Sequence, residues 1–118
     1  MSEHEQIQNF ITELRRGSLT LAVLGHLRKP YYGYVLLQAM QDNHIDIEAN
    51  TLYPLLRRLE SQGLLVSDWD TSESRPRKYY SISEKGKMVS EELIAEWKKM
   101  HSNIESIFGK DDHNETVN

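Results

Sequence analysis

The sequence predicts a mostly α-helical protein with one small β-hairpin, and three observations lead to this fold class. Four segments between residues 4 and 62 carry apolar residues at helical spacing. Residues 64–83 change to two short runs rich in aromatic and β-branched residues, which is typical of paired strands. From residue 84 the helical spacing returns, so a long helix should follow the hairpin.

Length and composition fit one globular domain. The chain has 118 residues, of which 38% are hydrophobic and 27% charged. No apolar run approaches the roughly 20 residues that cross a bilayer, so we expect no membrane partner. The absence of cysteine excludes disulfides, thiolate metal ligands and a cysteine nucleophile. The N-terminus is polar and acidic rather than signal-like, and we expect a cytoplasmic protein.

The first two predicted helices lie close together in the sequence. The first covers about residues 4–16, and we expect Gly17 to end it with a positive φ. The second starts after Ser18, a suitable N-cap, and stops at Lys29-Pro30. It is apolar nearly all round and should be buried. The first helix instead carries a single apolar stripe, made by Ile7, Phe10, Ile11 and Leu14.

The next two helices each have one apolar face. A third should run from about Gly33 to Asp42, and a fourth over roughly residues 49–62, where Gly63 can cap its end. Pro54 removes a backbone donor in the first two turns of the fourth helix, so we expect a loosened or slightly bent start. The buried face of that helix should consist of Leu52, Leu55, Leu56 and Leu59.

The hairpin and the last helix complete the domain, which we place at residues 1–108. Leu64–Asp70 and Arg77–Ser83 read as the two strands, joined by a polar and flexible tip. Ser83 can cap a helix over about residues 84–108. Residues 109–118 are polar without a pattern and should form a disordered tail.

Three helices followed by a hairpin form a winged helix-turn-helix, in which the third helix of the unit enters the major groove and the wing reaches the flanking backbone. Here the recognition helix is residues 49–62 and the wing residues 64–83. The face opposite the leucines carries side chains suited to bases and phosphates. These side chains are Asn50, Thr51, Tyr53, Arg57, Arg58 and Ser61. The alternative is an ordinary surface helix whose arginines pair with glutamates three residues away.

Charge distribution decides whether the wing suits DNA, because the net charge of −4 by itself does not favour it. Residues 51–85 carry 6 basic and 5 acidic side chains, whereas the flanking segments are acidic. Arg75, Arg77 and Lys78 lie on or next to the hairpin turn, where they can follow phosphates. Charges on a loop are otherwise usually just solvated, and we favour the DNA contact.

Three ordered motifs resemble the PadR family of transcriptional regulators. They are Tyr32-Gly33-Tyr34-Val35-Leu36-Leu37, then Thr51-Leu52-Tyr53-Pro54-Leu55-Leu56-Arg57-Arg58-Leu59-Glu60 with Gly63-Leu64-Leu65, and Arg75-Pro76-Arg77-Lys78-Tyr79-Tyr80-Ser81-Ile82-Ser83-Glu84-Lys85-Gly86. The resemblance covers about residues 10–108 and is to the smaller members with a single C-terminal helix. It implies a homodimeric repressor that binds inverted-repeat operators and releases them on sensing a small molecule.

The resemblance also assigns site residues. It puts Thr51, Tyr53, Arg57 and Arg58 on the recognition-helix motif and Arg77 and Lys78 on the wing motif. Asn50 departs from the family, which often has glycine there. The complete predicted DNA-binding set is Tyr34, Asn50, Thr51, Tyr53, Arg57, Arg58, Arg75, Arg77 and Lys78.

The last helix predicts a dimer independently of the resemblance. Its apolar residues alternate by four and three, which is the seam of a coiled coil and needs a partner. A second copy of the helix, together with the first helix, is the simplest partner; packing against its own domain is the alternative. The predicted interface consists of Phe10, Ile11, Leu14, Leu93, Trp97, Met100, Ile104 and Ile107.

Trp97 and Met100 are also candidates for ligand contact. An indole at the middle of the seam can stack on a flat aromatic molecule, and methionine suits an adaptable pocket. Some small PadR-like regulators bind planar drugs between their subunits, so the resemblance implies a planar or phenolic effector. The alternative is that both side chains only fill the dimer core.

Enzymatic and metal-dependent functions find no support. The five histidines show no metal-ligand spacing, and no nucleophile elbow, phosphate loop or dinucleotide fingerprint is present. We therefore expect no enzyme, no metal and no cofactor. The competing function is a winged-helix protein-interaction module that does not bind DNA, which would be expected to lose the basic wing or to expose an apolar recognition face.

Overall fold

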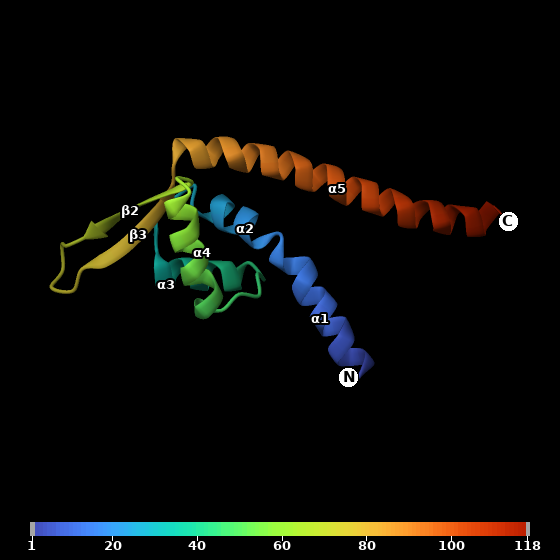
Figure 1. Cartoon of the computed structure of the whole chain (residues 1–118), viewed down its shortest axis with the longest axis horizontal. Helices are drawn as coiled ribbons and strands as arrows, with labels where there is room; N and C mark the ends of the chain where they lie inside the picture. Colours follow the sequence, from blue (N-terminus) through green and yellow to red (C-terminus); the bar gives the residue numbers. More distant parts are fainter. Residues whose placement is uncertain (1, 118) are drawn as a thin grey trace.

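The computed structural model describes residues 2–117, with side chains for residues 2–109. Its elements are α1 (Glu3–Arg16), α2 (Leu19–His26), β1 (Tyr31–Tyr32), α3 (Gly33–Asp42), α4 (Ala49–Ser61), β2 (Leu65–Asp70), β3 (Arg77–Ile82) and α5 (Glu84–Val117). Figure 1 shows a central body from which the hairpin extends at one end and α1 and α5 at the other. This order of helices and strands confirms the predicted winged helix-turn-helix. Among the described residues, no helix combines the length and the hydrophobicity needed to span a bilayer.

The core lies where α2, α3, α4 and the hairpin meet. Its side chains are almost entirely aliphatic, and the leucine face of α4 is buried as its spacing predicted. Gly63 ends α4 with a φ of +81°, a conformation that glycine adopts without strain. The amide of Leu64 then donates to the Leu59 carbonyl at 2.9 Å, which turns the chain directly into β2. Pro54 lies in the second turn of α4, inside the helix.

The sheet has three strands in the order β1-β3-β2, all antiparallel. The predicted hairpin is present, with Leu65 opposite Ile82 and Asp70 opposite Arg77. The prediction missed β1, whose two tyrosines pair with Tyr79 and Tyr80 of β3. Two residues between a proline and a helix are too few to show an alternating pattern.

The junction of α1 and α2 differs from the prediction. Gly17 has a φ of −65°, in the right-handed helical region, so the expected positive φ was wrong. Ser18 occupies the N-cap position of α2 as predicted, but its side chain makes no capping hydrogen bond; the hydroxyl donates to the Arg15 carbonyl at 2.9 Å instead. The chain therefore passes from one helix to the next through a right-handed turn, and no left-handed residue is needed.

The last helix begins as predicted and continues further. The amide of Gly86 donates to the Ser83 hydroxyl at 2.9 Å, which confirms the N-cap, and that hydroxyl also donates to the Gly63 carbonyl at 2.7 Å. The predicted end near residue 108 was wrong, because α5 reaches Val117. No proline follows Pro76 in the chain, and a glycine inside a helix costs only about 1 kcal/mol relative to alanine, so Gly109 does not stop it. The tail predicted for residues 109–118 therefore overlaps a helix, except for residue 118, which lies outside the described residues.

Candidate nucleic-acid interface

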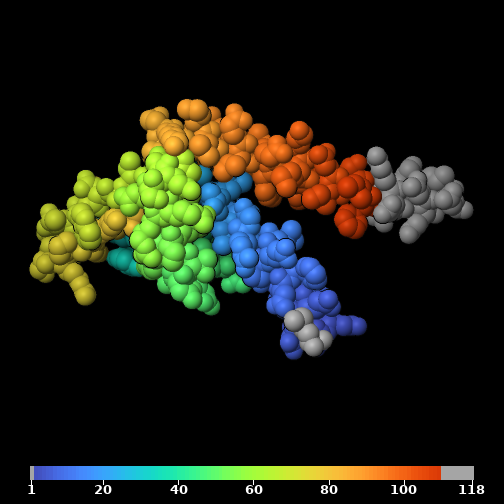
Figure 2. Space-filling view, viewed as in Figure 1, coloured from blue at the N-terminus to red at the C-terminus, as the bar shows by residue number. Residues whose placement is uncertain are grey.

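The solvent side of α4 carries the predicted recognition residues. Asn50, Pro54, Arg57 and Ser61 follow helical spacing and are all exposed, opposite the buried leucines. Thr51 and Arg58 flank this stripe and are exposed as well. Figure 2 shows α4, in green, at the surface between the hairpin and α1. The structure thus brings four of the nine predicted residues, Asn50, Thr51, Arg57 and Arg58, onto one open face of α4.

Three arginines of the predicted DNA-binding set, two on α4 and one in the hairpin turn, are free of acidic partners within residues 2–109. Within residues 2–109, Arg57, Arg58 and Arg75 form no ion pair, although Glu60 lies three residues from Arg57. Glu60 instead accepts from the Ser67 hydroxyl and pairs with Lys78 at 3.4 Å. These interactions, with the hydrogen bond from Ser67 foremost, lower the pKa of Glu60. The arginines therefore retain their hydrogen-bonding capacity for a ligand.

Lys78 occupies a different position from the free arginines. Its ammonium group lies 3.4 Å from the Glu60 carboxylate and 5.2 Å from the centre of the Tyr80 ring. Both partners hold it beside β3, near the last turn of α4. A phosphate would have to compete with Glu60 for this lysine.

Tyr53 is only half exposed, unlike its neighbours on α4. Its ring packs against the core and against Gly33 at the start of α3, where a Cβ atom would lie 2.8 Å from the Tyr53 Cε1 atom. The tyrosine therefore fixes the approach of α3 and α4, the two helices of the helix-turn-helix.

Tyr34 and Arg77 lie together where β3 begins, next to the hairpin turn. The Arg77 guanidinium donates to the Tyr34 hydroxyl at 3.0 Å and pairs with Glu73 at 3.1 Å. It also lies 4.6 Å from the centre of the Tyr32 ring, which stacks on Tyr34 at 6.2 Å. The hydrogen bond to Tyr34 is the main cause that raises the pKa of Arg77. These contacts tie the wing to the start of α3.

Asp70 completes the cluster and was not among the predicted site residues. The Tyr32 hydroxyl donates to the Asp70 carboxylate, and the amide of Ser72 donates to it at 3.0 Å. Hydrogen bonds from Ser72 and Tyr32 lower the pKa of Asp70 to about 2. The same hydrogen bond to Asp70 raises the pKa of Tyr32. The sequence signal for this cluster was the register that sets Asp70 opposite Arg77, but β1, which brings Tyr32 alongside, was not predicted.

The structure brings only part of the predicted dimer set together: Leu14, Leu93, Trp97, Met100 and Ile104 line one groove, whereas Phe10, Ile11 and Ile107 are not among its lining residues. The apolar seam of α5 is exposed, with Trp97 at 44%, and so are Phe10 and Leu14 of α1, at 64% and 79%; Ile11 is half-buried. The groove, of about 460 Å³, runs between α5 and the junction of α1 with α2, and its lining includes Trp97 and Met100. The Trp97 ring stacks on His101 at 5.0 Å.

Comparison with known proteins finds relatives that are transcriptional regulators with the same fold. Residues 21–92 match the Transcriptional regulator PadR-like family. The chain is 33% identical over 76 residues to the transcriptional regulator Rv3488 of Mycobacterium tuberculosis, covering 64% of this chain and 71% of that protein. A crystal structure of a PadR family transcriptional regulator from Eggerthella lenta superposes with a TM-score of 0.84 at 47% identity, over 89% of this chain and 94% of that one. A PadR-like transcription factor from Bacteroides fragilis superposes with a TM-score of 0.71 at 34% identity, over 84% and 98% of the two chains.

Proposed function

The chain belongs to the PadR-like family of transcriptional regulators, and on that premise we propose that it is a homodimeric repressor. It binds an inverted-repeat operator in double-stranded DNA and leaves it when a small molecule binds. The observation that carries the proposal is the open face of α4, on which Arg57 and Arg58 are exposed and unpaired among residues 2–109. Arginine binds guanine edges and phosphates through paired hydrogen bonds.

The homodimer is supported by the apolar surface that α1 and α5 leave uncovered. The radius of gyration is 18.3 Å, whereas a compact chain of this length would have about 13.5 Å. The difference comes from the two helices that project from the body (Figure 1). A second copy that packs its own seam against this one would cover Trp97, Met100 and Ile104, and a two-fold axis would present two copies of α4 to DNA.

The effector is supported by the groove beside Trp97. An indole ring that is 44% exposed offers a flat face for a planar or phenolic molecule, and Met100 provides an adaptable wall. His101 already covers one face of the indole, so a ligand would stack on the other face or displace the imidazole. Such a ligand would lie between α5 and α1, the helices that also make the proposed dimer.

A DNA titration tests the proposal. Fluorescence anisotropy would follow binding to the fragment immediately upstream of the protein's own gene, with excess competitor DNA and at two salt concentrations. The proposal predicts specific, salt-sensitive binding that weakens in Arg57→Ala. A folded dimer that binds no DNA at either salt concentration would overturn it in favour of a protein-interaction module.

A further inference from the structure

A groove between α4 and the α1–α2 junction has the chemistry of a phosphate site. It measures about 380 Å³, and its polar lining consists of Arg16, Thr20, Thr51 and Arg58. The remaining walls are apolar, and no carboxylate is found among the described residues that line this groove, which we call the α1–α4 groove. Two guanidinium groups and two hydroxyl groups can all donate hydrogen bonds to an anion.

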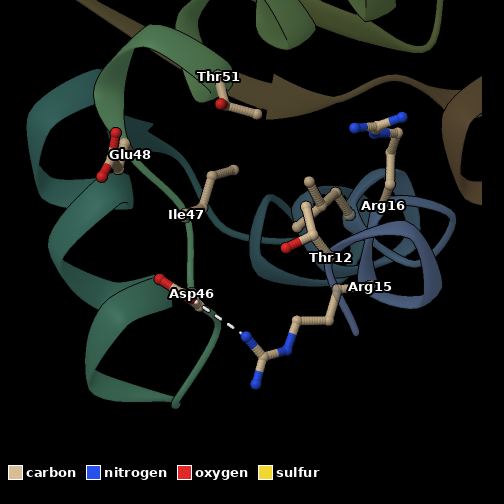
Figure 3. A pocket seen from close by; sticks show the side chains of 8 residues that line it. Thr12, Arg15, Arg16, Asp46, Ile47, Glu48 and Thr51 are labelled. Carbon is tan, nitrogen blue, oxygen red and sulfur yellow. Dashed lines mark hydrogen bonds and ion pairs between the residues drawn. The ribbon is translucent and has the colours of Figure 1, made fainter. Parts of the chain in front are cut away.

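Arg16 is the member of this set that comes from outside the helix-turn-helix. Its neighbour Arg15 pairs with Asp46 at 3.2 Å, whereas Arg16 forms no ion pair with any residue in the described part of the chain. Figure 3 shows the Arg15 side chain reaching Asp46 while that of Arg16 points away from it. The two adjacent arginines therefore differ in availability: one is bound to an acid, and the other is open at the edge of α4.

We propose that the α1–α4 groove seats a phosphate of the DNA backbone, with Arg16 and Thr20 donating to it beside Thr51 and Arg58. The inference rests on the proposed function, because it needs α4 to lie in the major groove. Side chains that flank a recognition helix meet the phosphates at the groove edge, and such contacts fix the register of the helix on the duplex. Arg16 would thereby couple α1, part of the proposed dimer interface, to the position of the recognition helix.

A pair of charge-matched variants tests this inference. Arg16→Ala and Arg15→Ala remove the same charge from adjacent, exposed positions of one helix, but only the first removes a phosphate ligand. In titrations over a series of salt concentrations, log K falls with log salt, and each lost phosphate contact reduces the magnitude of this negative slope by about 0.9. The expected result is a lower affinity and a smaller slope for Arg16→Ala, with Arg15→Ala equal to the unmodified protein.

Three results would overturn the inference. An Arg16→Ala protein with unchanged affinity and slope would show that the groove holds no phosphate, even though DNA binding by the unmodified protein would still support the proposed function. Equal losses in both variants would indicate a diffuse charge effect rather than a site. The absence of any DNA binding by the unmodified protein would overturn the proposed function as well.

Discussion

The basic side chains of the candidate interface fall into two groups according to their partners. Arg57, Arg58 and Arg75 have no acidic partner within residues 2–109, whereas Arg77 and Lys78 are held by Glu73 and Glu60. A cation that is already paired gains less from a phosphate, because the first partner must be released. We therefore propose that the free arginines contact DNA and that Arg77 positions the wing.

Replacing one free arginine should weaken specific binding. Arg57→Ala is expected to cost about 1–3 kcal/mol if the guanidinium contacts a base. Arg28→Ala is the matched control, since it removes the same charge from an exposed position between α2 and α5. Within the described residues, the Arg28 guanidinium forms one hydrogen bond, to the Gly25 carbonyl. Anisotropy titrations of both variants make the comparison. Equal affinity of the two variants would contradict the assignment.

The pKa of Asp70 reports whether Tyr32 holds the end of β2 through its hydrogen bond. Because its pKa is lowered to about 2, the folded state is stabilised by this group above its ordinary pKa near 3.8, and this stabilisation is lost as the pH falls towards 2. Tyr32→Phe removes one of the two donors, so the pKa of Asp70 should rise. Carboxyl resonances followed through an NMR pH titration measure the midpoint. A midpoint near 2 in both proteins would exclude the Tyr32 contact.

Close packing at Gly86 predicts a stability difference between two glycines. A Cβ atom at Gly86 would lie 2.1 Å from the Leu64 carbonyl oxygen, whereas one at Gly25 meets nothing within 4 Å. Gly86→Ala should destabilise the fold by about 1–3 kcal/mol. Gly25→Ala, inside α2, should be neutral or stabilising by up to about 1 kcal/mol. Urea denaturation measures both, and similar values would contradict the packing of α5 on the turn after α4.

Helices and hairpin could be predicted because each has a strong local pattern. The leucine spacing of α4, the capping serine of α5 and Gly63 all act within a few residues of one another, and all were correct. Features that depend on distant partners were missed. The strand β1 exists only because β3 lies beside it, and the cluster around Asp70 needs that strand to bring Tyr32 near. Arg15 and Lys78 likewise find their acids 31 and 18 residues away.

The exposed seam of α5 predicts the effect of a charge on assembly. Ile104→Lys places an ammonium group in the seam, where the dimer would have to bury it at high cost. Asn103→Lys is the matched control, because it adds the same charge one residue away, outside the spacing of the seam. Sedimentation at micromolar concentration should show a monomer for the first variant and a dimer for the second. Dimers in both cases would place the interface elsewhere.

The shape of the protein relates the open face of α4 to the apolar surface of α1 and α5. Its extents of 69 × 36 × 23 Å arise because α1 and α5 project from the winged helix-turn-helix body instead of folding back on it (Figure 1). In a two-fold dimer built on these helices, each body would carry one α4 helix to the same side. Dimers of helix-turn-helix proteins place such helices about 34–36 Å apart, one turn of DNA, or a multiple of this spacing. The geometry of the dimer therefore determines which operator spacing fits.

Hydroxyl-radical footprinting of the bound upstream fragment examines DNA recognition and dimer symmetry together. A two-fold dimer on its operator should give two protected segments related by a two-fold axis, with centres about 10 base pairs or a multiple apart. Protection should weaken in Arg57→Ala and disappear from one half-site or both in Ile104→Lys. A single unsymmetrical protected segment, or no protection by a folded dimer, would contradict the account.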